Sequence, residues 1–329
     1  MGFSTRNLNR LGNSFHIPLP IDEDGLTGRE CPDEKCLGYF KIKFGTGLKG
    51  SNLPCHCPYC GYIADHQKFF TEEQKSYALS VAKKEIFNAI SKDVLDWDHE
   101  LKNSTKNSFI KMSASFSHDH HPIQYYKEKE LETNVVCENC TLEYAIYGVF
   151  AYCPDCGEHN SFQILKKNFE IIKKEIALSE KSEDEELSRR LLEDALSNSV
   201  SSFDGFGRSI FSAYSSRANN PEQAKNISLQ NIQSAQKRVE ELFGYNFAND
   251  IDVTKWEIII KCFQKRHLVI HKMGVVDKEY LEKTKDNTSF LGRKINISHE
   301  EVLCFLDLLE KLGFSIKSQF SEPKKGTPE

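Results

Sequence analysis

Two cysteine pairs frame the most informative segment of this chain, which reads Cys137-Glu-Asn-Cys140-Thr-Leu-Glu-Tyr-Ala-Ile-Tyr-Gly-Val-Phe-Ala-Tyr-Cys153-Pro-Asp-Cys156-Gly157. Each pair has the Cys-x-x-Cys spacing, and twelve residues separate the two pairs. Four thiolates in this arrangement can surround one zinc ion as a tetrahedron. The residues between the pairs are rich in aromatic and β-branched types, which favours the strands of a hairpin, and Gly157 allows the turn after the second pair. Segment 137–157 therefore predicts a zinc site.

A second group of cysteines lies upstream, in Cys31-Pro-Asp-Glu-Lys-Cys36 and Cys57-Pro-Tyr-Cys60-Gly61. The residues 39–44 between them alternate apolar and polar types for most of their length, as in a half-buried strand. The first pair has four intervening residues, and Cys55 and His56 are competing ligands. We favour Cys31, Cys36, Cys57 and Cys60 as the ligands, with Cys55 spare.

Segments 31–61 and 137–157 each resemble a zinc ribbon. A closed site of four cysteines leaves no open coordination position for chemistry. We therefore expect two zinc ions with a structural role.

Length, charge and the distribution of cysteines limit the number of domains and the kinds of partner. The chain has 329 residues, 39 % hydrophobic, which suits about two domains with ordinary cores. Its net charge is −5, so contact with nucleic acid would need a local basic patch. Nine of the eleven cysteines precede residue 157, so the two halves are expected to be stabilised differently.

The location expected from the sequence is cytoplasmic. No apolar run is long enough to cross a membrane, and residues 1–11 lack the apolar core of a signal peptide. In a reducing compartment the cysteines are metal ligands rather than disulfides.

The segment between the two cysteine groups contains a helix and a histidine-rich loop. Thr71-Glu-Glu-Gln74 is a capping box that opens a helix expected to reach Trp97 (71–97). Further on, Ser115-Phe-Ser-His118-Asp119-His120-His121-Pro122 offers three imidazoles. Adjacent histidines on a strand point to opposite faces, so we favour a polar loop over a metal site.

The second half of the chain has the apolar periodicity of helices. Residues 161–184 predict a helical linker, 185–315 predict a bundle of four or five helices with short connections, and 316–329 a tail. Cys262 and Cys304 fall within helical stripes and are expected in the core. The fold class is therefore α+β and multidomain, with N-terminal zinc ribbons and a C-terminal all-α bundle, the two ribbons and helix 71–97 occupying residues 1–160.

One helix of the bundle carries Arg266-His267-Leu-Val-Ile-His271-Lys-Met-Gly274. This string resembles the Arg-x(4–6)-His signature of the HEPN superfamily. Gly274-Val-Val-Asp277-Lys-Glu-Tyr-Leu and Ser199-Val-Ser-Ser-Phe-Asp204 are also similar to that family. The resemblance covers residues 185–312, about two-fifths of the chain.

The resemblance implies a homodimer in which two Arg/His pairs face one cleft. Catalytic HEPN proteins are metal-independent endoribonucleases, some of them toxins or antiviral defence effectors with an antitoxin or sensor partner. The resemblance assigns the chemistry to Arg266 and His271. It places His267 at the variable polar position and makes Asp204 a candidate to orient Arg266.

Physical chemistry is compatible with these roles. Imidazole titrates near neutrality and can exchange a proton with a ribose hydroxyl or a leaving oxygen, and a guanidinium fork suits a phosphate. On an ideal helix, however, residues 266 and 271 lie about 140° apart, whereas His267 and His271 share a face.

The leading prediction is thus a metal-independent endoribonuclease whose substrate is RNA, with ribbons for recognition or regulation and no membrane contact. The alternative is a non-catalytic module that binds nucleic acid or protein. A zinc hydrolase built on His118, His120 and His121 ranks third.

Overall fold

The computed structural model describes residues 4–50, 53–107, 109–117 and 122–321, and His118, His120 and His121 lie outside them. The chain divides into two compact units. Unit 1 comprises Met1–Val149 and Cys153–Gly157, and unit 2 comprises Phe150–Tyr152 and Glu158–Glu329. The predicted α+β class is confirmed, because unit 1 contains small antiparallel sheets and unit 2 is a helical bundle. No helix in the described ranges has the length and apolar character needed to span a bilayer.

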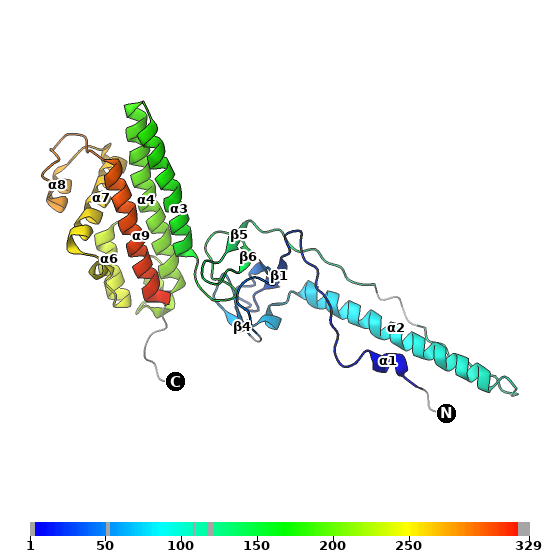
Figure 1. Cartoon of the computed structure of the whole chain (residues 1–329). Coiled ribbons are helices and arrows are strands. Elements are labelled where there is room, and N and C mark those ends of the chain that lie inside the picture. The colour runs from blue at the N-terminus through cyan, green and yellow to red at the C-terminus, as the bar shows by residue number, and fades with distance from the viewer. Residues whose placement is uncertain (1–3, 51–52, 108, 118–121, 322–329) are drawn as a thin grey trace. The chain divides into compact units, whose positions relative to one another are not determined.

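Unit 1 is built from short strands and one long helix (Figure 1). Its elements are α1 (Arg6–Arg10), β1 (Thr27–Glu30), β2 (Tyr39–Ile42), β3 (Pro54–His56), β4 (Ile63–Asp65), a 3-10 turn (His66–Phe69), α2 (Glu72–Ser104), β5 (Thr133–Val136) and β6 (Glu143–Ile146). Strands β3 and β4 form a separate hairpin.

One four-stranded sheet joins the two cysteine motifs. Its strand order is β1-β2-β6-β5, and all pairs are antiparallel. The central pairing sets Lys41 opposite Ala145 and Ile42 opposite Tyr144. The hairpin β1–β2 belongs to the first cysteine motif and β5–β6 to the second, so the two motifs share a backbone ladder.

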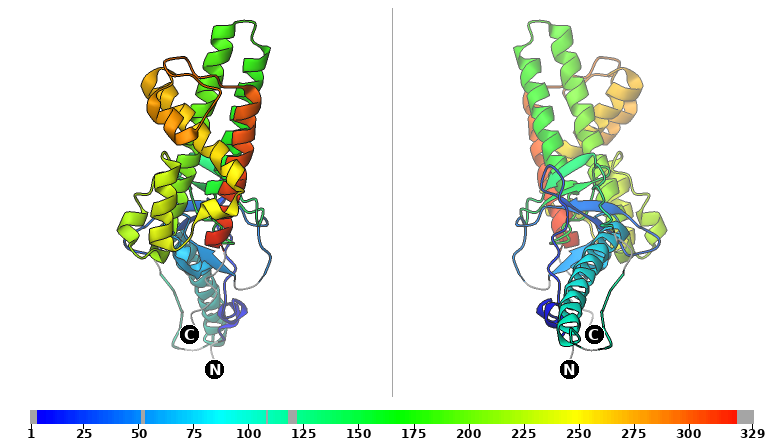
Figure 2. Two further views of the ribbon diagram at one scale, coloured as in Figure 1. Left: turned by 90° about the vertical axis from the view of Figure 1, so that its left-hand side faces the viewer. Right: turned by 90° about the vertical axis from the view of Figure 1, so that its right-hand side faces the viewer.

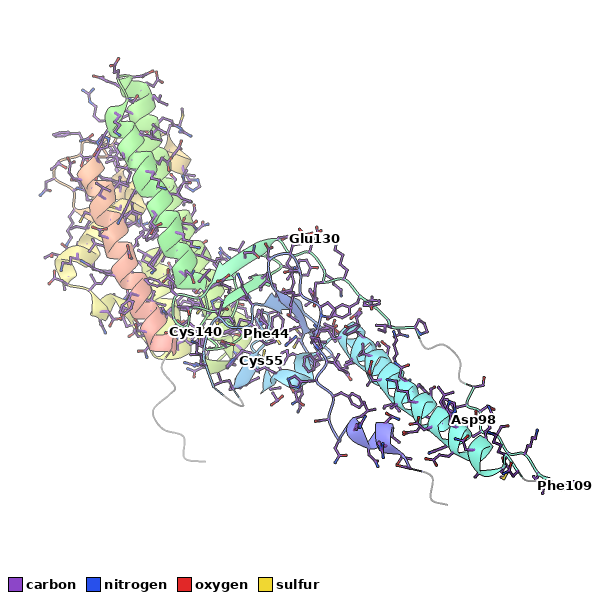
Figure 3. The ribbon with its side chains drawn as sticks, turned by 45° about the vertical axis from the view of Figure 1, so that its right-hand side comes forward. Phe44, Cys55, Asp98, Phe109, Glu130 and Cys140 are labelled. Carbon is purple, nitrogen blue, oxygen red and sulfur yellow. The ribbon has the colours of Figure 1, made fainter. Side chains whose placement is uncertain are left out.

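Helix α2 begins at the predicted capping box, in which Thr71 and Gln74 bond each other's backbone N–H. It continues to Ser104, seven residues beyond the predicted end. The chain then returns beside the helix, where the N–H of Ala114 donates to the Asp98 carboxylate (3.1 Å; Figure 3 labels Asp98). Helix α1 also packs against α2.

Among the described residues of unit 2, the regular elements are all helices. Its elements are α3 (Ser161–Lys181), α4 (Glu185–Ala213), a 3-10 turn (Ser215–Arg217), α5 (Pro221–Ala224), α6 (Ile232–Phe243), a second 3-10 turn (Phe247–Asp250), α7 (Val253–Lys272), α8 (Lys278–Thr284) and α9 (His299–Ser321). Helices α3, α4 and α9 run side by side in both views of Figure 2.

Helix α3 differs from the linker expected for residues 161–184. Leu165, Phe169 and Ile172 are buried in the same core as the apolar side chains of α4, α7 and α9. Gly313 on α9 allows this contact, because a Cβ there would lie 2.9 Å from Leu165. The bundle therefore begins at Ser161, and α9 extends it to Ser321, past the expected end at 315.

Candidate functional site

The first cysteine group gathers at the ends of two hairpins. Cys31 and Cys36 lie in the turn between β1 and β2, and Cys57 and Cys60 follow β3. The Sγ atoms of Cys31 and Cys60 are 3.7 Å apart, as are those of Cys36 and Cys57. Cys55 is outside the group, buried within β3 where it pairs with Ala64.

The second group combines the turn between β5 and β6 with a knuckle further along the chain. The Sγ atoms of Cys137 and Cys156 are 3.7 Å apart, and those of Cys140 and Cys153 are 3.5 Å apart. Thr141 adopts a φ of 65° in the first turn, and Gly157 a φ of 69° in the second. The backbone N–H of each of these two residues bonds the carbonyl four residues before it, which closes the turns around the sulfurs.

Both groups have the dimensions of a metal centre. All ligand atoms within each group lie within 4.8 Å of one another. A Zn–S bond of about 2.3 Å places the corners of a regular tetrahedron about 3.8 Å apart, close to the sulfur separations found here. Burial raises the pKa of Cys31, Cys57 and Cys140, so an ion that binds would displace protons. Each group can therefore hold one metal ion, and four thiolates suit zinc.

Helix α7 presents the Arg/His motif. Asp252 caps its first turn by accepting from Thr254, and Ile259 and Phe263 anchor it in the bundle core. Met273 ends the helix in the left-handed region, with a φ of 52°.

Past Phe263 the helix leaves the main core. His267 and His271 are exposed one turn apart, and their ring centroids are 4.8 Å apart. Leu268, on another face, joins a small second core formed with Val276, Tyr280 and Ile295. His271 is thus a surface side chain rather than a core residue.

A cavity of about 200 Å³ brings Arg266 and His267 together, whereas His271 does not line it. The walls come from three helices and are formed by Gln230, Asn231, Ile232 and Gln233 at the start of α6, by Phe263, Gln264, Arg266 and His267 of α7, and by Glu279 and Lys283 of α8. The first N–H groups of a helix have no partner within it and attract anions. The cavity therefore combines a guanidinium, an imidazole and a helix N-terminus.

The charges in this cavity are incompletely paired. The Nε of Arg266 is buried and has no hydrogen-bond partner among the described residues. Lys283 pairs with Glu279 at 2.6 Å and lowers the pKa of that carboxyl. Arg266 also has no ion-pair partner among the described residues, so its positive charge remains available to an anion in the cavity.

Asp204 holds the loop in front of α6. Its carboxylate accepts from Ser228 (2.8 Å) and from the N–H of Leu229 (2.6 Å), and it pairs with Arg208 (2.9 Å). Burial alone would raise the pKa of Asp204, but these hydrogen bonds lower it overall. Asp204 was expected as a candidate to orient Arg266, but its described partners are Arg208 and the loop that leads into α6.

The remaining cysteines have different environments. Cys262 is buried in the bundle core, as expected, and burial raises its pKa. Cys304 is exposed on α9, so its expected core position was wrong. It falls on the outer side of a helix whose apolar stripe is formed by Val302, Phe305 and Leu309.

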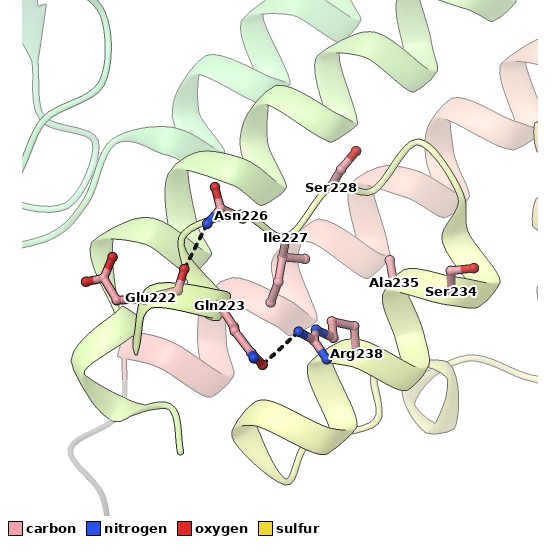
Figure 4. A pocket seen from close by; sticks show the side chains of 8 residues that line it. All are labelled: Glu222, Gln223, Asn226, Ile227, Ser228, Ser234, Ala235 and Arg238. Carbon is pink, nitrogen blue, oxygen red and sulfur yellow. Dashed lines mark hydrogen bonds between the residues drawn. The ribbon is translucent and has the colours of Figure 1, made fainter. Parts of the chain in front are cut away.

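A larger cavity of about 530 Å³ lies between α5 and α6 (Figure 4). Arg238 crosses it to donate to Gln223 (2.7 Å), and Asn226 donates to the carbonyl of Glu222 (2.9 Å). The polar side chains of Arg238, Gln223 and Asn226 in this cavity are therefore already hydrogen-bonded within the protein.

Sequence reasoning missed the walls that α6 and α8 give to the Arg266 cavity. Asn231 is an N-cap residue that accepts from the N–H of Ser234, and an Asn before an apolar stripe is a usable signal for it. Lys283 and Glu279 belong to a helix of seven residues, too short for a periodic pattern. No family model matches the chain, and comparisons with curated proteins and with solved structures also found no match.

Proposed function

We propose that this protein is a metal-independent endoribonuclease of the HEPN type, acting through Arg266 and His271 with His267 beside them. The observation that supports this most is the cavity in which an incompletely bonded Arg266 meets His267 and the N-terminus of α6. His271 lies one helical turn further on, in contact distance of His267. A guanidinium and helix N–H groups can stabilise charge on a phosphate, and imidazoles can transfer the protons of phosphate-ester cleavage.

The proposed reaction uses the RNA itself as nucleophile. An imidazole takes the proton of the ribose 2′-hydroxyl, whose oxygen attacks the adjacent phosphorus, and the bond from phosphorus to the 5′-oxygen breaks. A second imidazole donates a proton to that departing oxygen. Arg266 stabilises the charge that builds on the phosphate. The products are a 2′,3′-cyclic phosphate and a 5′-hydroxyl, and no metal takes part.

The position of His271 favours a site shared by two copies. Because it lies outside the cavity that Arg266 lines, one chain offers an incomplete Arg/His pair. The end of α7 is also bordered by exposed apolar side chains, Ile270 and Met273. A homodimer would cover them and bring the His271 of one copy to the Arg266 of the other.

Local charge supports an RNA substrate. Residues 261–294 contain nine Lys+Arg against four Asp+Glu, a net charge of +5 in a chain whose net charge is −5. A basic segment in an acidic chain concentrates attraction for phosphates around α7 and α8.

The two cysteine groups are proposed to hold structural zinc ions. Each offers four cysteines and no open position. Unit 1 would then recognise the RNA or a protein partner rather than cut.

The test is incubation of the purified protein with mixed cellular RNA in EDTA, beside His271→Ala, Arg266→Ala and His267→Ala. Exposure to EDTA is kept brief, because loss of structural zinc can unfold unit 1. We expect cleavage to fall by at least about a hundredfold for His271→Ala and Arg266→Ala. Lys255→Glu, a charge change at the exposed start of α7, serves as the control.

A mixing experiment tests the shared site. Inactive Arg266→Ala and His271→Ala chains, combined and allowed to exchange subunits, should regain part of the activity. A native protein that is folded and dimeric yet binds RNA without cutting it would instead favour the non-catalytic binding module.

A further inference from the structure

An exposed aromatic ring stands close to the end of α7. Phe290 belongs to the loop between α8 and α9 and is 71 % exposed. The course of this loop can be followed in Figure 1. The loop is held in place, because the N–H of Arg293 donates to the Phe290 carbonyl (3.1 Å) and the N–H of Val276 donates to the Arg293 carbonyl (2.9 Å). The backbone that carries Phe290 is therefore pinned to the segment that directly follows the Arg/His motif.

Three cationic residues, Lys272, Arg293 and Lys294, belong to this pinned backbone or are bonded to it. Lys294 pairs with Val275 in an isolated antiparallel bridge, and the Val275 N–H donates to the Lys272 carbonyl (2.9 Å). Within the part of the chain that the structure describes, Lys272, Arg293 and Lys294 have no ion-pair partner.

Three of the five other lysines in residues 261–294 are neutralised. Lys261 pairs with Asp286 (3.2 Å), Lys265 with Glu301 (2.6 Å) and Lys283 with Glu279 (2.6 Å). Lys278 and Lys285, at the two ends of α8, also have no ion-pair partner among the described residues, so Lys272, Arg293 and Lys294 are the unpaired cations next to the backbone that carries Phe290.

We propose that Lys272, Phe290, Arg293 and Lys294, here called the loop surface, bind single-stranded RNA, an inference that rests on the proposed function. A base stacks on the ring of Phe290 and the flanking phosphates contact the three cations, the combination by which proteins hold single strands. A duplex hides the faces of its bases, so it cannot use the ring. Lys272 adjoins His271, which places this strand beside the proposed point of cleavage.

A protein partner is the competing occupant of the loop surface, because Leu291, next to Phe290, is also exposed. The unpaired cations favour RNA, since a protein would have to bring matching carboxylates. The two occupants respond differently to substitution of Phe290: stacking requires an aromatic ring, whereas a protein contact accepts an aliphatic side chain of similar size.

The experiment measures binding of a fluorescein-labelled single-stranded RNA of about ten nucleotides to His271→Ala protein by fluorescence anisotropy. We expect Phe290→Leu and Phe290→Ala to weaken binding by about tenfold or more and Phe290→Trp to preserve it. Combined Arg293→Glu and Lys294→Glu should reduce the salt dependence, the slope of log K against log salt, by about 1.4. Lys255→Glu is the charge control.

Unchanged affinity of Phe290→Leu, or equal affinity for a blunt duplex, overturns the proposal. So does a Phe290→Leu protein that sediments as a smaller species without RNA, because Phe290 then lies between two copies of the chain. Cleavage is scored separately with His271 intact. If the chain binds RNA through Phe290 but never cuts it, the proposed catalysis is wrong and the loop surface stands. If the chain cuts RNA but substitution of Phe290 has no effect on binding, the loop surface is wrong and the proposed catalysis stands.

Discussion

At the residue scale, His159 shows how burial alone can set a protonation state. Its side chain is 8 % exposed, with the ring of Tyr152 edge-on at 4.9 Å between centroids. The N–H of Ser161 points at its Nδ1 (3.4 Å), so that nitrogen serves as acceptor. Burial lowers the pKa of His159 to about 4. Between about pH 4 and pH 6.5, the folded protein therefore keeps this imidazole mostly neutral, whereas an exposed imidazole would be mostly charged.

This shift predicts a pH dependence of stability. Because the pKa of His159 is lower in the folded state than the value of about 6.5 for an unfolded chain, its neutral form is stabilising above pH 6.5. That stability is lost as the pH falls toward 4. By pH 4.5 the loss should be about 2–3 kcal/mol in the free energy of unfolding. Urea unfolding of unit 2's helices at pH 7 and pH 4.5 measures it, and His159→Gln should flatten the difference; equal pH slopes in both proteins would contradict it.

Arg266 offers a second prediction at this scale. A lysine retains the positive charge but loses the planar fork and the buried Nε. We expect Arg266→Lys to lower RNA cleavage by about tenfold to a hundredfold, with the thermal unfolding temperature little changed. The rate of cleavage and a melting curve of the same preparation check this. A lysine variant as active as the native chain would mean that Arg266 supplies charge alone.

At the element scale, α1 is held on α2 by one carboxylate. Asp93 is 1 % exposed and accepts from the N–H of Asn7 (2.8 Å) and of Leu8 (3.0 Å), the role that a capping residue plays within one chain segment. A helix of five residues cannot persist by itself. Its order therefore depends on this contact with a distant part of the sequence.

Asp93→Ala should release α1 from α2. We expect the amide hydrogens of Asn7 and Leu8 to exchange at least about tenfold faster, while exchange in the β1-β2-β6-β5 sheet stays the same. Asp96→Ala is the matched control, because Asp96 accepts only one longer bond from Asn7 (3.3 Å). Hydrogen exchange read by mass spectrometry on N-terminal peptides makes the comparison. Equal exchange in the two variants would show that other contacts hold α1.

The scale of elements also separates what the sequence could predict from what it could not. The two cysteine groups and the start of α2 could be predicted from the spacing of a few residues. The buried stripe of Leu165, Phe169 and Ile172 could be predicted from helical periodicity. The pairing of Ile42 with Tyr144 joins residues about a hundred positions apart, and no local pattern encodes it. The wall that α8 adds to the Arg266 cavity is hidden for a similar reason, since its seven residues fold only against Leu268 and its neighbours.

At the scale of the whole molecule, the two units depend on different forces. Unit 2 buries a continuous core of large apolar side chains, among them Phe203, Phe206 and Phe305. The strands of unit 1 contain only three or four residues each, so its sheet cannot be stable on hydrogen bonds alone. Because β2 and β6 pair, each cysteine group steadies the sheet that carries the other.

The proposed zinc ions should therefore stabilise unit 1 and leave unit 2 unaffected. We expect about two zinc ions per chain by elemental analysis, about one in Cys137→Ser or Cys36→Ser, and still about two in Cys55→Ala, because Cys55 lies outside both groups. Structural zinc contributes about 10 kcal/mol or more to folding. Chelation should thus abolish the protection of β1, β2, β5 and β6 from hydrogen exchange. The amide hydrogens of the helices α3, α4, α7 and α9 should still exchange slowly. Loss of protection in both units together would mean that the bundle also depends on the metal, and full protection after chelation would mean that the thiols hold the sheet without it.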